Sequence, residues 1–150
     1  MHRLPALAGF LVLTFLAPLG GLVAKPDAWF ANLAKPSWNP PSWLFGPVWT
    51  LLYITIAVAA WGVWKRVGWN RAHGWWIAQL TLNAAWTPVF FGLHRPDLAV
   101  AIIVALWIAI AGTIAAFAKV ERWTAWLLAP YLAWVTFASA LNVAIWRLNP

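Results

Sequence analysis

Five long apolar runs, separated by short polar turns, make up most of the chain. They cover approximately residues 4–24, 44–64, 72–93, 98–118 and 123–146. A helix needs about 20 apolar residues to cross the hydrocarbon core of a bilayer. The pattern therefore predicts an all-α integral membrane protein. We expect a bundle of five transmembrane helices forming one domain over residues 1–150.

The first run, Leu4 to Ala24, has two interpretations because it follows the basic start Met-His-Arg. It could be the apolar region of a signal peptide. However, the candidate cleavage site Leu22-Val23-Ala24 lacks a small residue at its −3 position, and the run is long for a signal peptide. We therefore interpret it as the first membrane span.

The segment between the first two runs is rich in proline and aromatic residues. It ends with Trp38-Asn39-Pro40-Pro41-Ser42-Trp43 and leads into Leu44-Phe45-Gly46-Pro47 at the start of the second run. The prolines disfavour a helix through the first half, whereas Pro47 suits the first turn of the helix that follows. Structured loops of roughly nineteen residues are typically lids or binding loops. The sequence thus predicts a structured loop between helices 1 and 2.

Composition and charge agree with a lipid environment. The chain is 64% hydrophobic and 9% charged, whereas a soluble domain has about 25% charged residues. Ten Lys+Arg against three Asp+Glu give a net charge of +7. These basic residues lie between the apolar runs. We therefore interpret them as residues that set the membrane orientation and contact lipid headgroups, and we expect no nucleic-acid partner. The predicted cytoplasmic, N-terminal side would carry Arg3, Lys65, Arg66, Arg71, Lys119 and Arg122.

The ionisable residues argue against several classes of chemistry. Asp27, Asp97 and Glu121 all fall in turns, so no carboxylate is expected within a span, which disfavours an ion-coupled transporter. The three histidines lie at span ends without ligand spacing, so we expect interfacial side chains and no metal site. The chain has no cysteine and no recognisable hydrolase triad.

Polar and aromatic residues at helical spacing are the remaining candidates for a site. Three such faces are Gln79, Asn83 and Trp86; Trp49 and Tyr53; and Tyr131, Trp134, Ala138 and Leu141, with Asn142 beside the last. Spacing alone favours a role of the amides in holding helices together. The alternative is an aromatic-walled cavity under the loop, suited to a flat apolar ligand with a polar edge.

Three segments resemble the TspO/MBR family, the translocator proteins, in its bacterial form. They are Lys35-Pro36-x-Trp38-Asn39-Pro40-Pro41-x-Trp43 continuing to Tyr53, Gln79-Leu80-x-Leu82-Asn83-x-x-Trp86-Thr87-Pro88, and Pro130-Tyr131-Leu132-x-Trp134 followed by Leu141-Asn142. The resemblance implies a multi-pass membrane protein, often a homodimer, in the bacterial cell envelope. It also implies a pocket beneath the first loop for protoporphyrin IX or haem, sterols and drug-like ligands, with no required cofactor.

The resemblance further implies roles for individual residues. The ligand-binding set would be Trp38, Trp43, Phe45, Trp49, Gln79, Asn83, Trp86, Trp134, Ala138 and Leu141. Trp49 and Trp134 would be the catalytic pair in a light-dependent breakdown of protoporphyrin IX. The sterol motif proposed for the family needs a tyrosine, and the stretch from Leu141 to Arg147 has none. Porphyrin is therefore favoured over sterol as the ligand.

Three functions are compatible with these features. The first is a membrane tetrapyrrole-binding protein that degrades the pigment in light. The second is a sensor or carrier without enzymatic activity. The third is a transporter, which the absence of repeated halves and of intramembrane charge disfavours.

Overall fold

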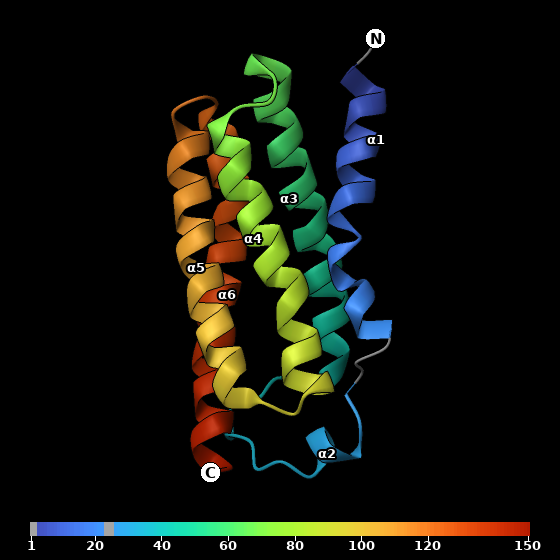
Figure 1. The fold of residues 1–150 in the computed structure, drawn as a ribbon, viewed down its shortest axis with the longest axis vertical. Coiled ribbons are helices and arrows are strands. Elements are labelled where there is room, and N and C mark those ends of the chain that lie inside the picture. The colour runs from blue at the N-terminus through green and yellow to red at the C-terminus, as the bar shows by residue number, and fades with distance from the viewer. Residues whose placement is uncertain (1–2, 23–25) are drawn as a thin grey trace.

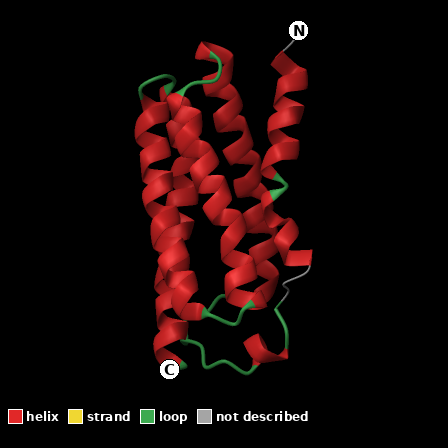
Figure 2. Ribbon diagram, in the orientation of Figure 1, coloured by secondary structure: helices red, strands yellow, loops and turns green. Residues whose placement is uncertain are grey.

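The computed structural model describes residues 3–22 and 26–150. Long helices run side by side along its longest axis (Figure 1). The helices in chain order are α1 (Arg3–Thr14), the 3-10 helix η1 (Ala17–Leu22), α2 (Ala28–Ala31), the 3-10 helix η2 (Ser42–Leu44), α3 (Phe45–Val67), α4 (Arg71–Thr87), the π-helix η3 (Pro88–Gly92), α5 (Pro96–Ala118) and α6 (Arg122–Leu148). Across those described residues there is no β-strand (Figure 2).

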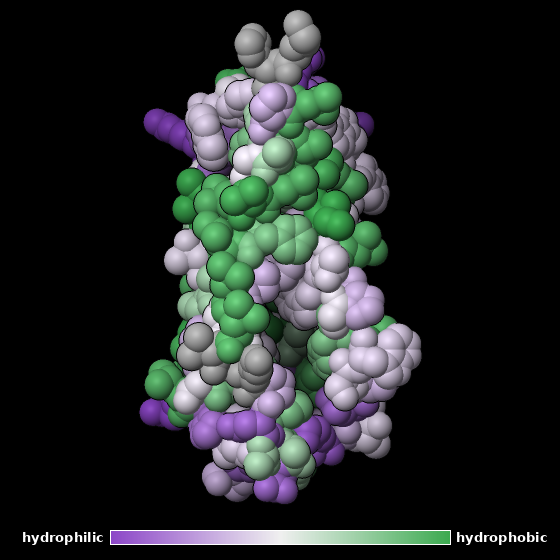
Figure 3. Space-filling model, turned by 90° about the vertical axis from the view of Figure 1, so that its right-hand side faces the viewer, coloured by the Kyte–Doolittle hydropathy of each residue, from purple (hydrophilic) through white to green (hydrophobic). Residues whose placement is uncertain are grey.

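Four helical stretches are long and apolar enough to cross a membrane: Arg3–Leu22, Ser42–Val67, Pro96–Ala118 and Arg122–Leu148. The fifth member of the bundle is α4, which continues into η3 and packs against α5 (Figure 1). Figure 3 shows hydrophilic side chains near the two ends of one face, with a hydrophobic region along α1 between them. The predicted five-helix membrane bundle is confirmed.

Two of the predicted spans are interrupted rather than continuous. The first α-helix ends at Thr14, because Pro18 has no N–H to donate to the Thr14 carbonyl, and the chain continues as η1. Residues 23 and 24 of the predicted first span lie outside the described residues. Pro88 has the same effect in the third span, where the Leu93 N–H donates to the Pro88 carbonyl at 2.9 Å in a wider π-turn.

The loop between the first two spans is structured, as predicted. The Lys35 ammonium donates to the carbonyls of Phe30 at 2.7 Å and Leu33 at 3.3 Å. The side chain of Asn149, just beyond α6, forms two hydrogen bonds of 2.9 Å with the backbone of Ala34. The loop therefore runs across one end of the bundle and is fastened to the end of α6 (Figure 1).

His73 differs from the prediction that it is interfacial. Its side chain is buried, and its Nε2 lies 3.0 Å from the Ala60 carbonyl oxygen while its Nδ1 lies 3.4 Å from the Asn70 amide. The ring also lies 6.1 Å from that of Phe10, in a stacked arrangement. The reason is that α3 approaches α4 closely enough for the imidazole to bond across the helix pair.

Gly62 allows α3 to lie directly against the start of α6. A Cβ atom at this position would be 2.5 Å from the Trp123 ring and 2.7 Å from the Thr124 methyl. We expect Gly62→Ala to lower the free energy of unfolding by about 1–3 kcal/mol, because neither neighbour can move without disturbing the helix contact. Unfolding in mixed micelles measures this effect.

Gly9→Ala is the matched control, because a Cβ atom there would meet nothing within 4 Å. It should be neutral or slightly stabilising, since alanine favours a helix over glycine. Equal stabilities of the two variants would contradict the close packing at Gly62.

Candidate ligand site

Five aromatic side chains meet at the loop end of the bundle. Phe45 and Trp49 lie one turn apart at the start of α3, and Trp134 and Phe137 lie one turn apart on α6. The Trp134 ring is 5.7 Å from that of Phe45, 6.4 Å from that of Trp49 and 5.6 Å from that of Phe137. Trp38 of the loop completes the group, 5.6 Å from Phe137. We call these five residues the aromatic wall.

The indole nitrogen of Trp134 has an unusual environment. It is buried and has no hydrogen-bond partner, and no other fully buried side-chain nitrogen or oxygen in the described part of the chain shares this condition. Leaving such a donor unpaired costs about 1–3 kcal/mol. By contrast, the indole N–H groups of Trp61, Trp76, Trp86 and Trp107 all donate hydrogen bonds. Trp134 therefore offers a donor within the aromatic wall.

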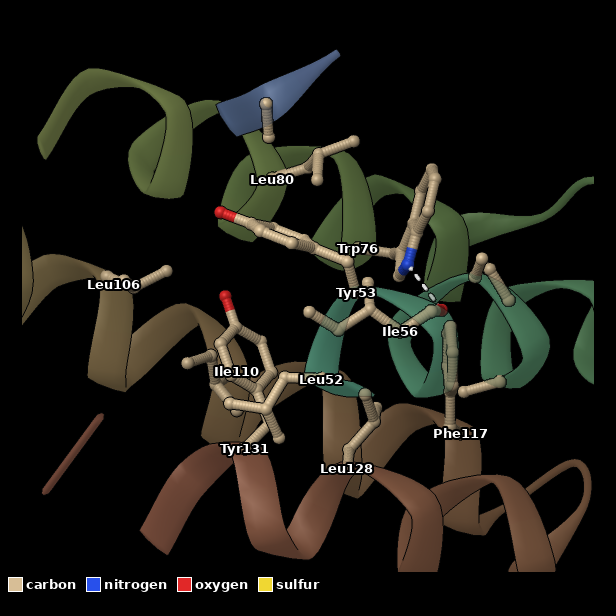
Figure 4. Packing of buried hydrophobic residues seen from close by; sticks show 14 of the residues in the cluster. Leu52, Tyr53, Ile56, Trp76, Leu80, Leu106, Ile110, Phe117, Leu128 and Tyr131 are labelled. Atoms are coloured by element: carbon tan, nitrogen blue, oxygen red, sulfur yellow. Dashed lines mark hydrogen bonds between the residues drawn. The ribbon is translucent and has the colours of Figure 1, made fainter. Parts of the chain in front are cut away.

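Beneath the wall, two tyrosines and two amides form a continuous chain of hydrogen bonds. The Tyr53 hydroxyl donates to Asn83 Oδ1 at 2.7 Å, and Asn83 Nδ2 donates to the Tyr131 hydroxyl at 2.8 Å. The Tyr131 hydroxyl donates to Gln79 Oε1 at 2.8 Å. We call these four residues the amide–tyrosine network. It joins α3, α4 and α6, and Figure 4 shows both tyrosines within the main buried cluster.

The network lies directly next to the aromatic wall. The Trp49 ring is 5.5 Å from that of Tyr53 and 6.3 Å from that of Tyr131. Gln79 is only 1% exposed, and Gln79 and Asn83 use their amides for contacts between and within helices. The arrangement supports the interpretation of these amides as helix-bonding groups that hold the floor of the site in place.

Trp86 and Leu141 belong to a neighbouring group. The Trp86 indole donates to Asn142 Oδ1 at 2.9 Å and stacks on Phe90 with ring centres 4.8 Å apart. Leu141 is buried in the same smaller cluster as Phe90, whereas Ala138 packs against the main cluster. Trp86 packs against both clusters, so it lies where the main cluster meets the smaller one at the end of α4.

The loop contributes one of its two predicted tryptophans to the site. Trp38 contacts Phe137 and is 46% exposed, whereas Trp43 is 72% exposed and has no ring contact in the described structure. Phe137 was not among the residues expected from the sequence. Its position three residues after Trp134, on the same helical face, is the signal that could have identified it.

Two cavities lie toward the opposite end of α3 from the aromatic wall. One, of about 280 Å³, is lined by Arg3, Gly62, Lys65, Arg66, Glu121 and Trp123. The other, of about 210 Å³, is lined by Ala6, Gly9, Phe10, Leu13, Trp64 and Trp69. Neither includes a wall residue. The rings of the wall contact one another, so a large planar ligand would have to separate them.

Comparison with known proteins gives a consistent result. The TspO/MBR family model matches residues 6–147. The tryptophan-rich sensory protein of Cereibacter sphaeroides is 44% identical over 144 residues, covering 93% of this chain and 91% of that protein. The tryptophan-rich protein TspO of Chlorobaculum tepidum is 47% identical over 131 residues, covering 84% of this chain and 83% of that protein. The translocator protein of Homo sapiens is 40% identical over 126 residues, covering 81% of this chain and 75% of that protein.

The match spans all five helices of the bundle as well as the loop that carries Trp38. The relatives are also covered over most of their own length. With its five-helix bundle, the chain is a multi-pass membrane protein that belongs to the TspO/MBR family.

Proposed function

We propose that the protein binds a tetrapyrrole, such as protoporphyrin IX or haem, against the aromatic wall. The observation that carries the proposal is the buried indole N–H of Trp134, which has no partner among the described residues and is surrounded by aromatic rings. Aromatic faces stack on a flat ligand, and a few polar groups fix its orientation. A tetrapyrrole supplies both the large planar face and hydrogen-bond acceptors.

Binding would require the loop to move. In the structure, Trp38 lies against Phe137, and the wall rings lie within contact distance of one another. The loop is fastened by exposed contacts, chiefly the Asn149–Ala34 pair, and such contacts open at low cost. We infer that the tetrapyrrole displaces Trp38 and occupies the space between the loop and the amide–tyrosine network.

Two activities are consistent with such a site. In the first, the bound pigment absorbs light and is degraded, with Trp49 and Trp134 as oxidisable indoles; the pigment supplies the chemistry and the protein orients it. In the second, the protein is a sensor or carrier without turnover. The relative from Cereibacter sphaeroides is named a tryptophan-rich sensory protein, which supports considering this second activity. Sterols and drug-like apolar molecules would compete with the tetrapyrrole for the same aromatic wall. If the protein forms a homodimer, each protomer would carry one such wall.

Replacing Trp134 by phenylalanine tests the binding mode. Trp134→Phe keeps an aromatic ring but removes the N–H donor, so we expect about tenfold weaker binding of protoporphyrin IX, the equivalent of one hydrogen bond in a dry site. Purified protein is titrated with protoporphyrin IX in the dark while the pigment absorbance and the tryptophan fluorescence are recorded.

Trp126→Phe is the matched control, because Trp126 lies on the same helix with its side chain 72% exposed. It should bind the pigment as the unmodified protein does. Non-saturable binding to the unmodified protein would contradict the proposed function. Equal affinities of the two variants would contradict the role of the Trp134 donor.

A further inference from the structure

The larger cavity lies where the start of α1, the end of α3 and the start of α6 meet. Its volume is about 280 Å³, and its lining includes three basic side chains and one acidic one, Arg3, Lys65, Arg66 and Glu121. Pockets for drug-sized ligands measure about 300–1,000 Å³. The cavity is therefore suited to a small anionic group rather than to a tetrapyrrole.

Two tryptophans give the cavity a defined shape. The Trp61 indole donates to the Arg3 carbonyl at 2.7 Å and so ties the first turn of α1 to α3. Trp123 packs over Gly62, where the absence of a side chain leaves room for the indole. The Lys65 ammonium lies 4.1 Å from the centre of the Trp61 ring and 5.9 Å from that of Trp123. These cation–π contacts hold the ammonium in place beside the cavity.

The charges that line the cavity leave an excess of positive charge. Arg66 Nε lies 3.7 Å from Glu121 Oε1, and the Arg66 side chain is 66% exposed. Glu121 therefore offsets Arg66. Arg3 and Lys65 form no ion pair within residues 3–22 and 26–150. An anion in the cavity would thus meet two cations from different helices, α1 and α3.

The position of the cavity is the one expected for a site at a membrane surface. It is at the helix ends, next to the tryptophans Trp61 and Trp123, and indoles concentrate at the boundary between hydrocarbon and headgroups. The same end of the bundle carries Arg71, Lys119 and Arg122. An excess of Lys and Arg marks the cytoplasmic side, whose leaflet is rich in anionic lipids.

We propose that this cavity binds the phosphate of an anionic phospholipid headgroup. Arg3 and Lys65 face the phosphate, the indoles of Trp61 and Trp123 lie at the depth of the glycerol, and the acyl chains remain in the bilayer beside α1 and α3. The site is independent of the tetrapyrrole proposal, because it lies at the other end of α3 and shares no residue with the aromatic wall.

Lipid titration of the purified full chain in detergent tests the proposal. Native mass spectrometry counts bound lipids as phosphatidylglycerol or phosphatidylcholine is added. We expect saturable binding of one phosphatidylglycerol per chain and at least about tenfold weaker binding of phosphatidylcholine, because the choline cation offsets the phosphate charge and would be repelled by Arg3 and Lys65.

Arg3→Gln with Lys65→Gln should weaken phosphatidylglycerol binding at least about tenfold, because each change replaces a charge-assisted contact with the phosphate by a neutral one. The matched control, Arg71→Gln with Lys119→Gln, removes the same charge from the same end of the bundle but outside the cavity, and should change the affinity less than about twofold. Thermal unfolding without lipid shows whether each variant is folded. Protoporphyrin IX binding should be the same in both, which separates this proposal from the proposed function.

Three results would overturn the proposal. Equal losses in the two double variants would show a diffuse attraction between the basic end and any anionic lipid. Equal binding of phosphatidylcholine, a zwitterion with the same phosphate group, would exclude a site that selects anionic headgroups. Competition by soluble glycerol 3-phosphate at the same concentration as phosphatidylglycerol would assign the cavity to a soluble phosphate ester instead of a lipid.

Discussion

Asn83→Leu is expected to lower the free energy of unfolding by about 2–4 kcal/mol. Asn83 is the centre of the amide–tyrosine network, since its side chain accepts from Tyr53 at 2.7 Å and donates to Tyr131 at 2.8 Å. Leucine has a similar volume but cannot bond, so the buried Tyr53 hydroxyl would lose its partner. A hydrogen bond between membrane helices averages about 0.6 kcal/mol, and an unpaired buried group costs about 1–3 kcal/mol more.

A double-mutant cycle with Tyr53→Phe separates these two contributions. When the hydroxyl has already been removed, Asn83→Leu no longer leaves it unpaired, so the double variant should lose clearly less stability than the sum of the single variants. Reversible unfolding in mixed micelles, followed by circular dichroism, provides the free energies.

The control for this cycle lies on the same helix. Thr81 is exposed, and its hydroxyl bonds only within α4, to the Ile77 carbonyl at 2.9 Å. Thr81→Val should change the free energy of unfolding by less than about 0.5 kcal/mol. A similar small effect for Asn83→Leu would mean that the network does not stabilise the bundle.

The sequence predicted which side chains point inward, because hydrocarbon imposes a strict rule. An amide in a membrane helix needs a partner, so Gln79 and Asn83 had to face the bundle interior. Both are buried and bonded to tyrosines of other helices. The sequence could not identify those partners, since Asn83 is separated by 30 positions from Tyr53 and by 48 from Tyr131. Such pairings depend on how the helices are rotated against one another.

The loop illustrates the opposite case. Its aromatic and proline content predicted order, but not which rings would face the bundle. Trp38 contacts Phe137, whereas Trp43 points outward, because η2 begins after the double proline and rotates the chain between them. A periodicity rule applies to a helix or a strand and gives no facing direction for an irregular segment. The hydrogen bonds by which Asn149 holds the loop could not be predicted either, because they join positions 115 residues apart.

The largest functional effect is expected for Trp49→Phe combined with Trp134→Phe. In a protein that degrades the bound pigment, this double variant should slow the light-dependent loss of protoporphyrin IX by about tenfold or more. The two rings meet edge to face, 6.4 Å apart, so both can contact one ligand. Phenylalanine preserves most of the apolar contact but is much harder to oxidise than an indole.

The measurement follows the pigment absorbance in oxygenated buffer under constant illumination, with every variant saturated so that weaker binding does not affect the rate. Trp107→Phe with Trp126→Phe is the control, because both side chains are exposed on the outside of the bundle. This double variant removes the same number of indoles as the first. It should leave the rate unchanged. Equal rates in the two double variants would show that Trp49 and Trp134 take no part in the degradation. Saturable binding without any light-dependent loss in the unmodified protein would instead establish a sensor or carrier, because the same aromatic wall would then hold the pigment without consuming it.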